Sequence, residues 1–117
     1  MLKAYTYANC DTCRKAVKFL KAHDISFTEI PIREMPPSKK ELREMLSAQG
    51  SNLRKLFNTA GRDYREQGLS ARLPQMSEAE AIELLASNGN LVKRPFVIGP
   101  GIHLVGFEET SWKAALL

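Results

Sequence analysis

The sequence predicts a single α/β domain over residues 1–117, with a mixed four-stranded sheet and flanking helices. Three observations lead to this prediction: a strand–helix–strand pattern opens the chain, a helical stretch follows, and two short apolar strands with a final helix close it. A strand–helix–strand unit implies a right-handed crossover between parallel strands, whereas a terminal hairpin adds an antiparallel edge. The length of 117 residues is that of one ordinary domain.

The opening strand–helix–strand unit is marked by a change of periodicity. Residues 2–7, LKAYTY, are apolar and aromatic and predict the first strand. Helical periodicity begins after residues 9–12 and continues to about residue 24. Residues 25–32, ISFTEIPI, alternate and predict the second strand, so the two strands lie parallel in one sheet.

Two capping boxes predict the helices of the middle segment. Ser38 is followed three positions later by Glu41, and Ser77 by Glu80, which is the pattern in which the two side chains satisfy each other's backbone N–H groups. We expect the first of these helices to end near Gly50 and the second to stop at Gly89.

The remaining segments complete the order of elements. Residues 52–58 predict a short helical piece, and residues 59–74 read as turn-rich. The segments PFVIG and IHLVGF flank Gly99-Pro100-Gly101, which predicts a hairpin with a three-residue turn. Residues 108–117 predict an amphipathic helix.

Composition excludes several classes of protein. The formal net charge of +4 is compatible with an anionic substrate but is small for a protein that binds nucleic acid directly. No apolar run approaches the roughly 20 residues of a membrane helix, and the first residues show no signal-peptide core. We therefore expect a cytoplasmic protein with no membrane contact. Structural disulfides are rare in that compartment, so two close cysteines indicate catalysis, redox chemistry or metal binding.

Cys10 has the strongest functional signal in the chain. It falls where the first strand turns into the first helix, so its thiolate faces free backbone N–H groups and the positive end of the helix dipole. Both lower the pKa of a thiol. Arg14 follows one helical turn later and is expected to stabilise the same charge. The Cys-x-x-x-Arg spacing therefore predicts an anion site around a nucleophile.

Cys13 has two interpretations that the sequence leaves open. With a rotation of about 100° per residue, it shares one apolar stripe with Ala16, Val17 and Leu20, so it faces the core. A free cysteine in such a place is often a small core residue. Alternatively, Cys13 resolves an oxidised or derivatised Cys10 as a disulfide, for which the spacing is suitable.

A zinc site is the weaker alternative for the cysteine pair. The chain contains only two histidines, His23 and His103, so a Cys2His2 site would use every candidate. His23 falls near a helix C-terminus and His103 within an apolar strand. We therefore predict no metal site.

Arg94 and Pro95 precede the third strand. From the residues alone, the peptide bond before Pro95 is predicted to be trans, because only about 5% of X–Pro bonds are cis in folded proteins.

Three motifs in order resemble the arsenate reductase (ArsC)/Spx family. They are Y-x-x-x-x-C-x-x-C-R-K-A from Tyr5, NTAGRDYREQGL over 58–69, and KRPFVIGPGIHLVGF over 93–107. The resemblance implies a thioredoxin-like fold, with core segments 1–32 and 91–117 and a helical subdomain inserted at 33–90. It also implies that Pro95 is cis and faces the active cysteine, in contrast to the prediction from the residues alone.

The resemblance also implies roles for individual residues. Cys10 matches the family's nucleophile, and Arg14 and Arg94 match two arginines near it. In arsenate reductases the nucleophile attacks arsenate, glutathione displaces the arsenic, and glutaredoxin completes the reduction. By this likeness, glutathione or glutaredoxin is the expected reductant and no cofactor is bound. The catalytic candidates are Cys10, Cys13 and Arg14, and the substrate-binding candidates are Arg94, Pro95, Arg62 and Asn9.

The sequence departs from the arsenate reductase pattern at three positions. Thr6 stands where those enzymes have a histidine, and Asn58 and Gly106 stand where they have oxyanion-binding arginines. Arg62 and Arg65 are the residues available to compensate. The chain is therefore expected to retain only some of the residues that bind arsenate in those enzymes.

Two other branches of the family resemble the chain at its cysteine pair. The Cys-x-x-Cys spacing resembles Spx, a redox-sensing regulator that binds the RNA polymerase α subunit. The start NCD resembles proteins that act as glutathione-dependent thiol reductases. We expect an enzyme acting on an oxyanion or a thiol substrate, with the alternative that a Cys10–Cys13 switch controls binding to RNA polymerase.

Overall fold

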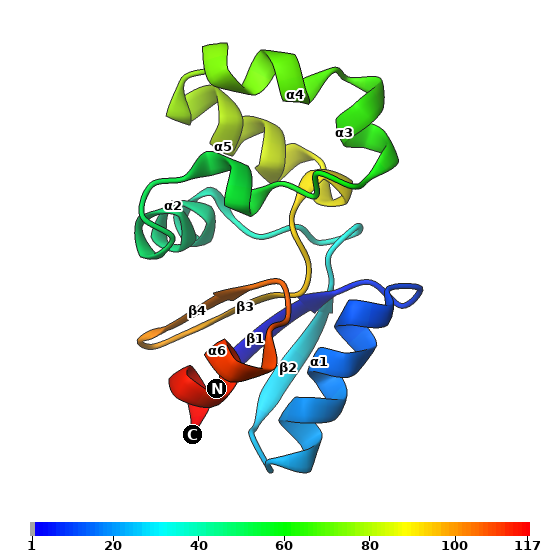
Figure 1. Cartoon of the computed structure of the whole chain (residues 1–117), viewed down its shortest axis with the longest axis vertical. Coiled ribbons are helices and arrows are strands. Elements are labelled where there is room, and N and C mark those ends of the chain that lie inside the picture. Colours follow the sequence, from blue (N-terminus) through cyan, green and yellow to red (C-terminus); the bar gives the residue numbers. More distant parts are fainter. Residues whose placement is uncertain (1) are drawn as a thin grey trace.

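The computed structural model describes residues 2–117 and shows one four-stranded sheet with helices on both faces (Figure 1). The strands are β1 (Leu2–Thr6), β2 (Phe27–Pro31), β3 (Phe96–Gly99) and β4 (Ile102–Val105). The α-helices are α1 (Asp11–Ala22), α2 (Lys39–Ala48), α3 (Arg62–Glu66), α4 (Leu69–Arg72), α5 (Glu78–Ser87) and α6 (Glu109–Leu116). Short 3-10 helices are η1 (Leu53–Leu56), η2 (Leu73–Gln75) and η3 (Gly89–Leu91).

The sheet has the order β2-β1-β3-β4 and mixes parallel with antiparallel pairing. β1 and β2 are parallel, whereas β3 is antiparallel to both β1 and β4. Because β1 and β2 run in the same direction, their carboxyl ends meet at one edge of the sheet. The mixed sheet predicted from the order of elements is confirmed.

The two faces of the sheet bury separate apolar clusters. Alternate residues of a strand point to opposite faces, so Ala4 and Val97 pack with residues of α1 and α6, including Phe19 and Trp112. The opposite face is covered by the layer of helices α2 to α5 and the short helices between them (Figure 1). Tyr5 belongs to that second cluster. The first strand thus anchors both layers.

Both capping boxes form as predicted. The Ser38 hydroxyl accepts a hydrogen bond from the Glu41 amide, and the Ser77 hydroxyl accepts one from the Glu80 amide. In each box the glutamate side chain accepts a hydrogen bond from the backbone N–H of its serine. Both helix starts therefore follow from local sequence.

The structure differs from the prediction in two segments. The hairpin turn has two residues, not three, because Gly99 still pairs with Ile102. The stretch that reads as turn-rich contains α3, α4 and η2. Helices this short are unstable alone, but here they bury Tyr64, Leu69 and Leu73 in the core. Tertiary packing therefore stabilises helices that local propensity does not predict.

The peptide bond between Arg94 and Pro95 is cis. The trans prediction from the residues alone is wrong, and the cis bond expected from the family resemblance is confirmed. Among residues 2–117, the structure contains no helix of the length and apolar character that a membrane span requires.

Candidate functional site

Cys10 occupies the N-cap of α1, directly after the loop that leaves β1. Its backbone is extended, with φ −112° and ψ 113°, and its sulfur accepts a hydrogen bond from the Cys13 amide across 3.3 Å. A cap side chain in this position satisfies one of the amides that the first helical turn leaves unpaired. The turn that caps the helix therefore also holds the thiol at the half-buried end of α1.

The surroundings of Cys10 lower its pKa. Burial acts in the opposite direction and raises the pKa, but the hydrogen bonds from Cys13 and the hydrogen bond and positive charge of Arg94 outweigh it. Each of these groups stabilises the thiolate more than the thiol. A lowered pKa increases the fraction of Cys10 that is thiolate, which is the reactive form of a thiol.

Cys13 behaves in the opposite way. Only 2% of its surface is exposed, and burial, followed by the hydrogen bond with Cys10, raises its pKa to about 12. The prediction that Cys13 faces the core is confirmed. Both cysteines are free thiols, and the proposed resolving role of Cys13 stays a prediction.

Arg14 has a different environment from the one expected. Its guanidinium donates to the Ala8 carbonyl across 2.9 Å and to the Asp11 carboxylate across 2.6 Å. Asp11 lies one turn before Arg14 on the same helix face and competes for it. Arg94, which is distant in the chain, lowers the Cys10 pKa through a hydrogen bond and its positive charge. Arg14 therefore braces the loop before Cys10.

Tyr7 joins Arg94 to a second arginine that the sequence did not single out. The guanidiniums of Arg33 and Arg94 lie 5.0 and 4.9 Å from the centre of the Tyr7 ring, and Arg33 also donates to the Tyr7 hydroxyl across 2.9 Å. A hydrogen bond from Asn9 and the charge of Arg33 lower the Tyr7 pKa. Asn9 thus contacts Tyr7, which links it to the two arginines.

A cavity of about 190 Å³ opens beside this stack. It is lined by Tyr7, Arg33, Asn58, Gly61, Arg62, Asp63, Asn90 and Arg94. Of the two arginines that the sequence offered as substitutes in the anion site, Arg62 lines this cavity and Arg65 does not. The Nη1 atom of Arg94 is buried and has no hydrogen-bond partner among the described residues.

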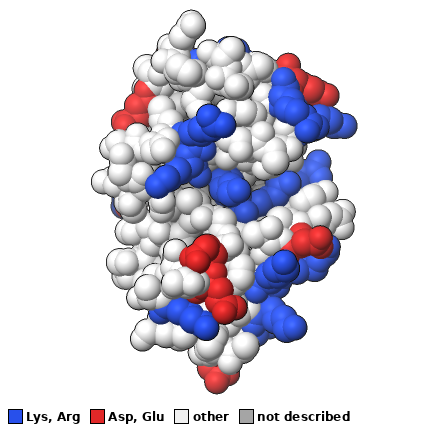
Figure 2. All heavy atoms as spheres, viewed as in Figure 1, with Lys and Arg blue, Asp and Glu red and all other residues white. Residues whose placement is uncertain are grey.

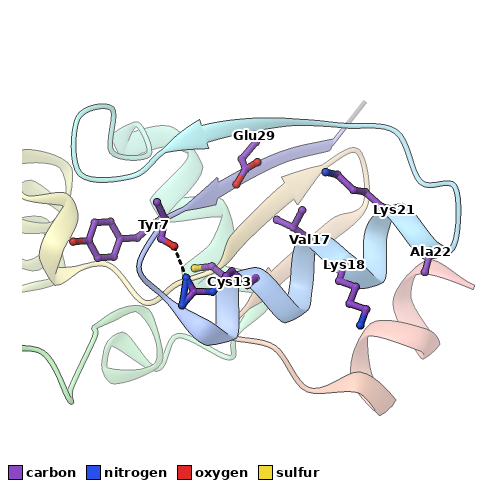
Figure 3. Close-up of a pocket in the computed structure, with 9 residues that line it drawn as sticks. Tyr7, Cys13, Val17, Lys18, Lys21, Ala22 and Glu29 are labelled. Atoms are coloured by element: carbon purple, nitrogen blue, oxygen red, sulfur yellow. Dashed lines mark hydrogen bonds between the residues drawn. The ribbon is translucent and has the colours of Figure 1, made fainter.

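A second, larger groove runs along α1 (Figure 3). It has a volume of about 540 Å³ and is lined by Tyr7, Ala8, Cys13, Arg14, Val17, Lys18, Lys21, Ala22 and Glu29. In Figure 3 the Tyr7 ring points away from α1, whereas Val17 and Lys21 border the groove. Tyr7 lines both the groove and the cavity.

Sequence reasoning missed Tyr7 and Arg33. Both follow the carboxyl ends of parallel strands, Tyr7 after β1 and Arg33 after β2. Side chains at that edge often form the binding site of an α/β sheet. This topological signal was available once the strands were predicted, although nothing in it selects these two residues.

Comparison with known proteins places the chain in a family. Residues 5–115 match the sequence model described as the ArsC family. The chain belongs to the ArsC family. It is 46% identical over 112 residues to the uncharacterised protein YusI of Bacillus subtilis (strain 168), which covers 96% of this chain and 95% of that protein.

Two further ArsC-family relatives carry different names. A structure from Streptococcus mutans, titled as that of "a possible arsenate reductase", shares 39% identity and a TM-score of 0.86, with 92% of each chain covered. The global transcriptional regulator Spx of Streptococcus agalactiae is 28% identical over 99% of this chain and 83% of that protein. Fold and family are thus common to proteins that are named as an enzyme and as a regulator.

Thr6 and Gly106, two of the three positions at which the sequence differs from the arsenate reductase pattern, have structural roles in this ArsC-family chain. The buried Thr6 hydroxyl donates to the Glu29 carboxylate across 2.6 Å. Gly106 has a φ of +68°, which disfavours any residue with a side chain. Its amide donates to the Pro95 carbonyl across 2.9 Å. Neither position contributes a cation to the Cys10 site.

No metal centre is evident in residues 2–117, where no three His, Cys, Asp or Glu side chains cluster with ligand geometry.

Proposed function

We propose that this protein is a thiol-dependent oxidoreductase in which Cys10 is the nucleophile. The observation that supports this most directly is the hydrogen bond of 3.3 Å from the Cys13 amide to the Cys10 sulfur, which together with the hydrogen bond and charge of Arg94 lowers the Cys10 pKa. A lowered pKa raises the fraction of thiolate at neutral pH, and the thiolate is the reactive form. The reducing cytoplasm is the compartment in which such a reaction fits.

The proposed substrate is a small disulfide. The Cys10 thiolate attacks one sulfur of the substrate, a Cys10–substrate disulfide forms, and the substrate's own S–S bond breaks. The departing thiolate takes a proton from water. A glutathione thiolate, or Cys13 after losing its proton to solvent, then attacks the Cys10 sulfur and releases the second half of the substrate. Two thiols are oxidised to one disulfide, and the substrate disulfide is reduced to two thiols.

Arsenate is the less favoured substrate of the same nucleophile. Its reduction requires oxyanion binding at Cys10, which in the resembling enzymes uses several arginines. Here Arg94 supplies positive charge at Cys10, while Asn58 and Gly106 contribute none. Charge-assisted hydrogen bonds from arginine are the strongest contacts available to an oxyanion. The weakened set of cations therefore supports disulfide chemistry.

The test compares the two substrates with one protein preparation. The purified protein is assayed either with glutathione and the mixed disulfide of glutathione and 2-hydroxyethanethiol, or with glutathione, glutaredoxin and arsenate. We expect disulfide reduction, no comparable arsenite production, and loss of activity in Cys10→Ser. Activity that survives in Cys10→Ser would refute the proposed nucleophile. Full activity in Cys13→Ser would assign resolution to glutathione and leave Cys13 as a core residue.

A second candidate function is suggested by the likeness to Spx. The Cys-x-x-Cys pair and the 28% identity over nearly the whole chain favour a redox-controlled partner surface. This alternative predicts binding to the RNA polymerase α subunit that changes when Cys10 and Cys13 are oxidised. Binding measured with reduced and oxidised protein tests it, with Cys10→Ser as the variant that cannot switch. Equal binding in both states, or none, excludes it.

A further inference from the structure

Three arginine residues line the cavity of about 190 Å³ beside Tyr7. Arg33 reaches it from the segment after β2, Arg62 from the start of α3, and Arg94 from the residue before the cis-proline. Figure 2 shows Lys and Arg side chains gathered across the middle of the molecule, between the helical layer and the sheet. The cavity therefore concentrates positive charge drawn from three separate parts of the chain.

The protein neutralises little of this charge. Among the described residues, no carboxylate lies within 4.0 Å of a nitrogen of Arg33 or Arg94, and Arg62 reaches only the exposed Glu66, across 3.7 Å. Asp63 lines the cavity, but its carboxylate accepts hydrogen bonds from the amides of Asn88 and Asn90. Three cations thus face one carboxylate that is already engaged.

One nitrogen in this group lacks an acceptor. Arg94 Nη1 is shielded from solvent and makes no hydrogen bond to the described residues. A buried donor without a partner destabilises the folded protein, and more strongly when the group is charged. Arg94 therefore has unused hydrogen-bonding capacity within the protein.

The position of Cys10 determines which anion fits. Cys10 does not line the cavity, yet Arg94 both lines it and acts on the Cys10 thiolate. A ligand that uses both places must carry its negative charge some distance from its reacting atom. In arsenate the charge surrounds the reacting arsenic itself. An organic thiol or disulfide with a separate carboxylate meets the requirement.

We propose that this cavity binds the carboxylate of a low-molecular-weight thiol, or of its disulfide, while the sulfur of that molecule reacts at Cys10. The proposal rests on the proposed function and names its substrate class. Guanidinium forks pair with carboxylates through two parallel hydrogen bonds. The Tyr7 ring holds Arg33 and Arg94 together, and the volume is suited to one carboxylate arm and not to a whole cofactor.

The first experiment measures binding without turnover. S-methylglutathione has carboxylates but cannot exchange disulfides, and it is titrated by calorimetry into the Cys10→Ser protein. We expect saturable binding, weakened about tenfold or more when Arg33→Gln or Arg62→Gln is added, because each removes a hydrogen bond to a charged group. Arg65→Gln is the matched control, since Arg65 is an exposed arginine of the same helix that does not line the cavity.

Two binding results would overturn the proposal. Equal weakening by Arg65→Gln would mean that general surface charge attracts the ligand. Displacement of S-methylglutathione by an equal concentration of inorganic phosphate would mean that the cavity is a general oxyanion pocket. This experiment does not depend on turnover, so it distinguishes failure of the cavity assignment from failure of the proposed reaction.

The second experiment measures selectivity. With dithiothreitol, an uncharged dithiol, as the reductant of both substrates, the ratio of kcat/KM for glutathione disulfide to kcat/KM for neutral 2-hydroxyethyl disulfide is compared between wild type, Arg33→Gln and Arg65→Gln. We expect this ratio to fall about tenfold in Arg33→Gln and to stay unchanged in Arg65→Gln. An unchanged ratio in Arg33→Gln contradicts the proposal. Absence of any turnover in wild type would count against the proposed reaction. The calorimetry would then still show whether the cavity binds S-methylglutathione.

Discussion

The Cys13 amide donates a hydrogen bond to the Cys10 sulfur across 3.3 Å, and this contact makes the two thiols chemically unequal. The pKa of Cys10 is lowered, whereas burial and the neighbouring Cys10 raise the pKa of Cys13 to about 12. The two cysteines thus lie within one helical turn, but Cys10 ionises more readily than an ordinary cysteine and Cys13 less readily. Any disulfide exchange at this site begins at Cys10.

The first prediction concerns the pH dependence of alkylation. Because the folded protein lowers the pKa of Cys10, its reaction with iodoacetamide reaches half of the maximal rate at a lower pH than an ordinary cysteine, whose pKa is about 8.5. Arg94→Gln removes the stabilising cation and moves this midpoint upward. Each unit of upward shift lowers the thiolate fraction about tenfold at a pH well below the midpoint.

Mass spectrometry of the labelled peptide checks this prediction. Cys13 should stay unlabelled near neutral pH, because its pKa of about 12 and its burial both protect it. Lys93→Gln changes the charge of the exposed residue next to Arg94 and serves as the control. A midpoint that is the same in wild type and Arg94→Gln would show that Arg94 does not set the reactivity of Cys10.

The second prediction concerns acid stability through Glu41. This carboxylate of α2 accepts hydrogen bonds from the Tyr5 hydroxyl across 2.7 Å and from the Lys3 ammonium across 3.1 Å, and so joins the helical layer to β1. Burial raises the Glu41 pKa, but the hydrogen bonds from Tyr5, Ser38 and Lys3 together lower it by more. The net shift is therefore downward. The ionised Glu41 therefore stabilises the folded protein at pH values above the pKa that Glu41 has in the unfolded chain. This stabilisation is lost as the pH falls through the lower pKa that Glu41 has in the folded protein.

Glu41→Gln isolates this effect. The variant is expected to be less stable than wild type near neutral pH, and the difference in free energy of unfolding should shrink below about pH 4, near the ordinary pKa of glutamate. Urea unfolding at a series of pH values measures it. Glu44→Gln, an exposed position on the same helix, is the control. If the difference in free energy of unfolding between wild type and Glu41→Gln were the same at all pH values, the loss would come from altered packing and not from the ionisation of Glu41.

The third prediction concerns the close approach of Gly89 to the segment before Arg33. A Cβ at position 89 would lie 1.8 Å from the Ile32 carbonyl oxygen and 2.9 Å from the Arg33 Cα. These are backbone atoms that no rotamer change can move. Gly89→Ala is therefore expected to destabilise the protein by about 3 kcal/mol and to displace Arg33 from the cavity. Ser87→Ala, nearby and exposed, should change stability by less than about 0.5 kcal/mol.

Thermal unfolding and the S-methylglutathione titration together check the Gly89 prediction. Wild-type stability in Gly89→Ala would show that the two segments separate easily, and that the position of Arg33 does not depend on this contact.

The fourth prediction concerns Trp112 in α6. Its ring is 1% exposed, packs against Phe19 and Phe107, and donates from Nε1 to the Gly106 carbonyl across 3.1 Å. Trp112→Ala should cost about 3–5 kcal/mol of unfolding free energy. Trp112→Phe retains most of the packing but leaves the Gly106 carbonyl without its donor, and should cost about 1–3 kcal/mol.

Urea unfolding followed by far-ultraviolet circular dichroism measures both variants, because the signal does not depend on the indole. Lys113→Ala, at the neighbouring exposed position, should stay within about 0.5 kcal/mol of wild type. Equal losses in Trp112→Phe and Trp112→Ala would contradict a separate contribution from ring packing.

Much of the fold was predictable because its signals are local. Periodicity marked the strands and the long helices, and the serine–glutamate boxes marked the starts of α2 and α5. The helices α3 and α4 were missed because they are too short to be stable alone and depend on burying Tyr64 and Leu69. The length of the hairpin turn was also missed, since it depends on whether Gly99 stays paired.

By itself, the sequence determined the order of elements, the placement of Cys10 at a helix start and the core-facing stripe that includes Cys13. These depend on contacts between near neighbours in the chain, which periodicity and capping patterns record. Only the tertiary structure decided that Arg94 stabilises the Cys10 thiolate, and that Arg33, Arg62 and Arg94 line one cavity. Those pairings join residues that are distant in the chain, and local spacing contains no information about which distant cation the folded sheet brings to the thiol.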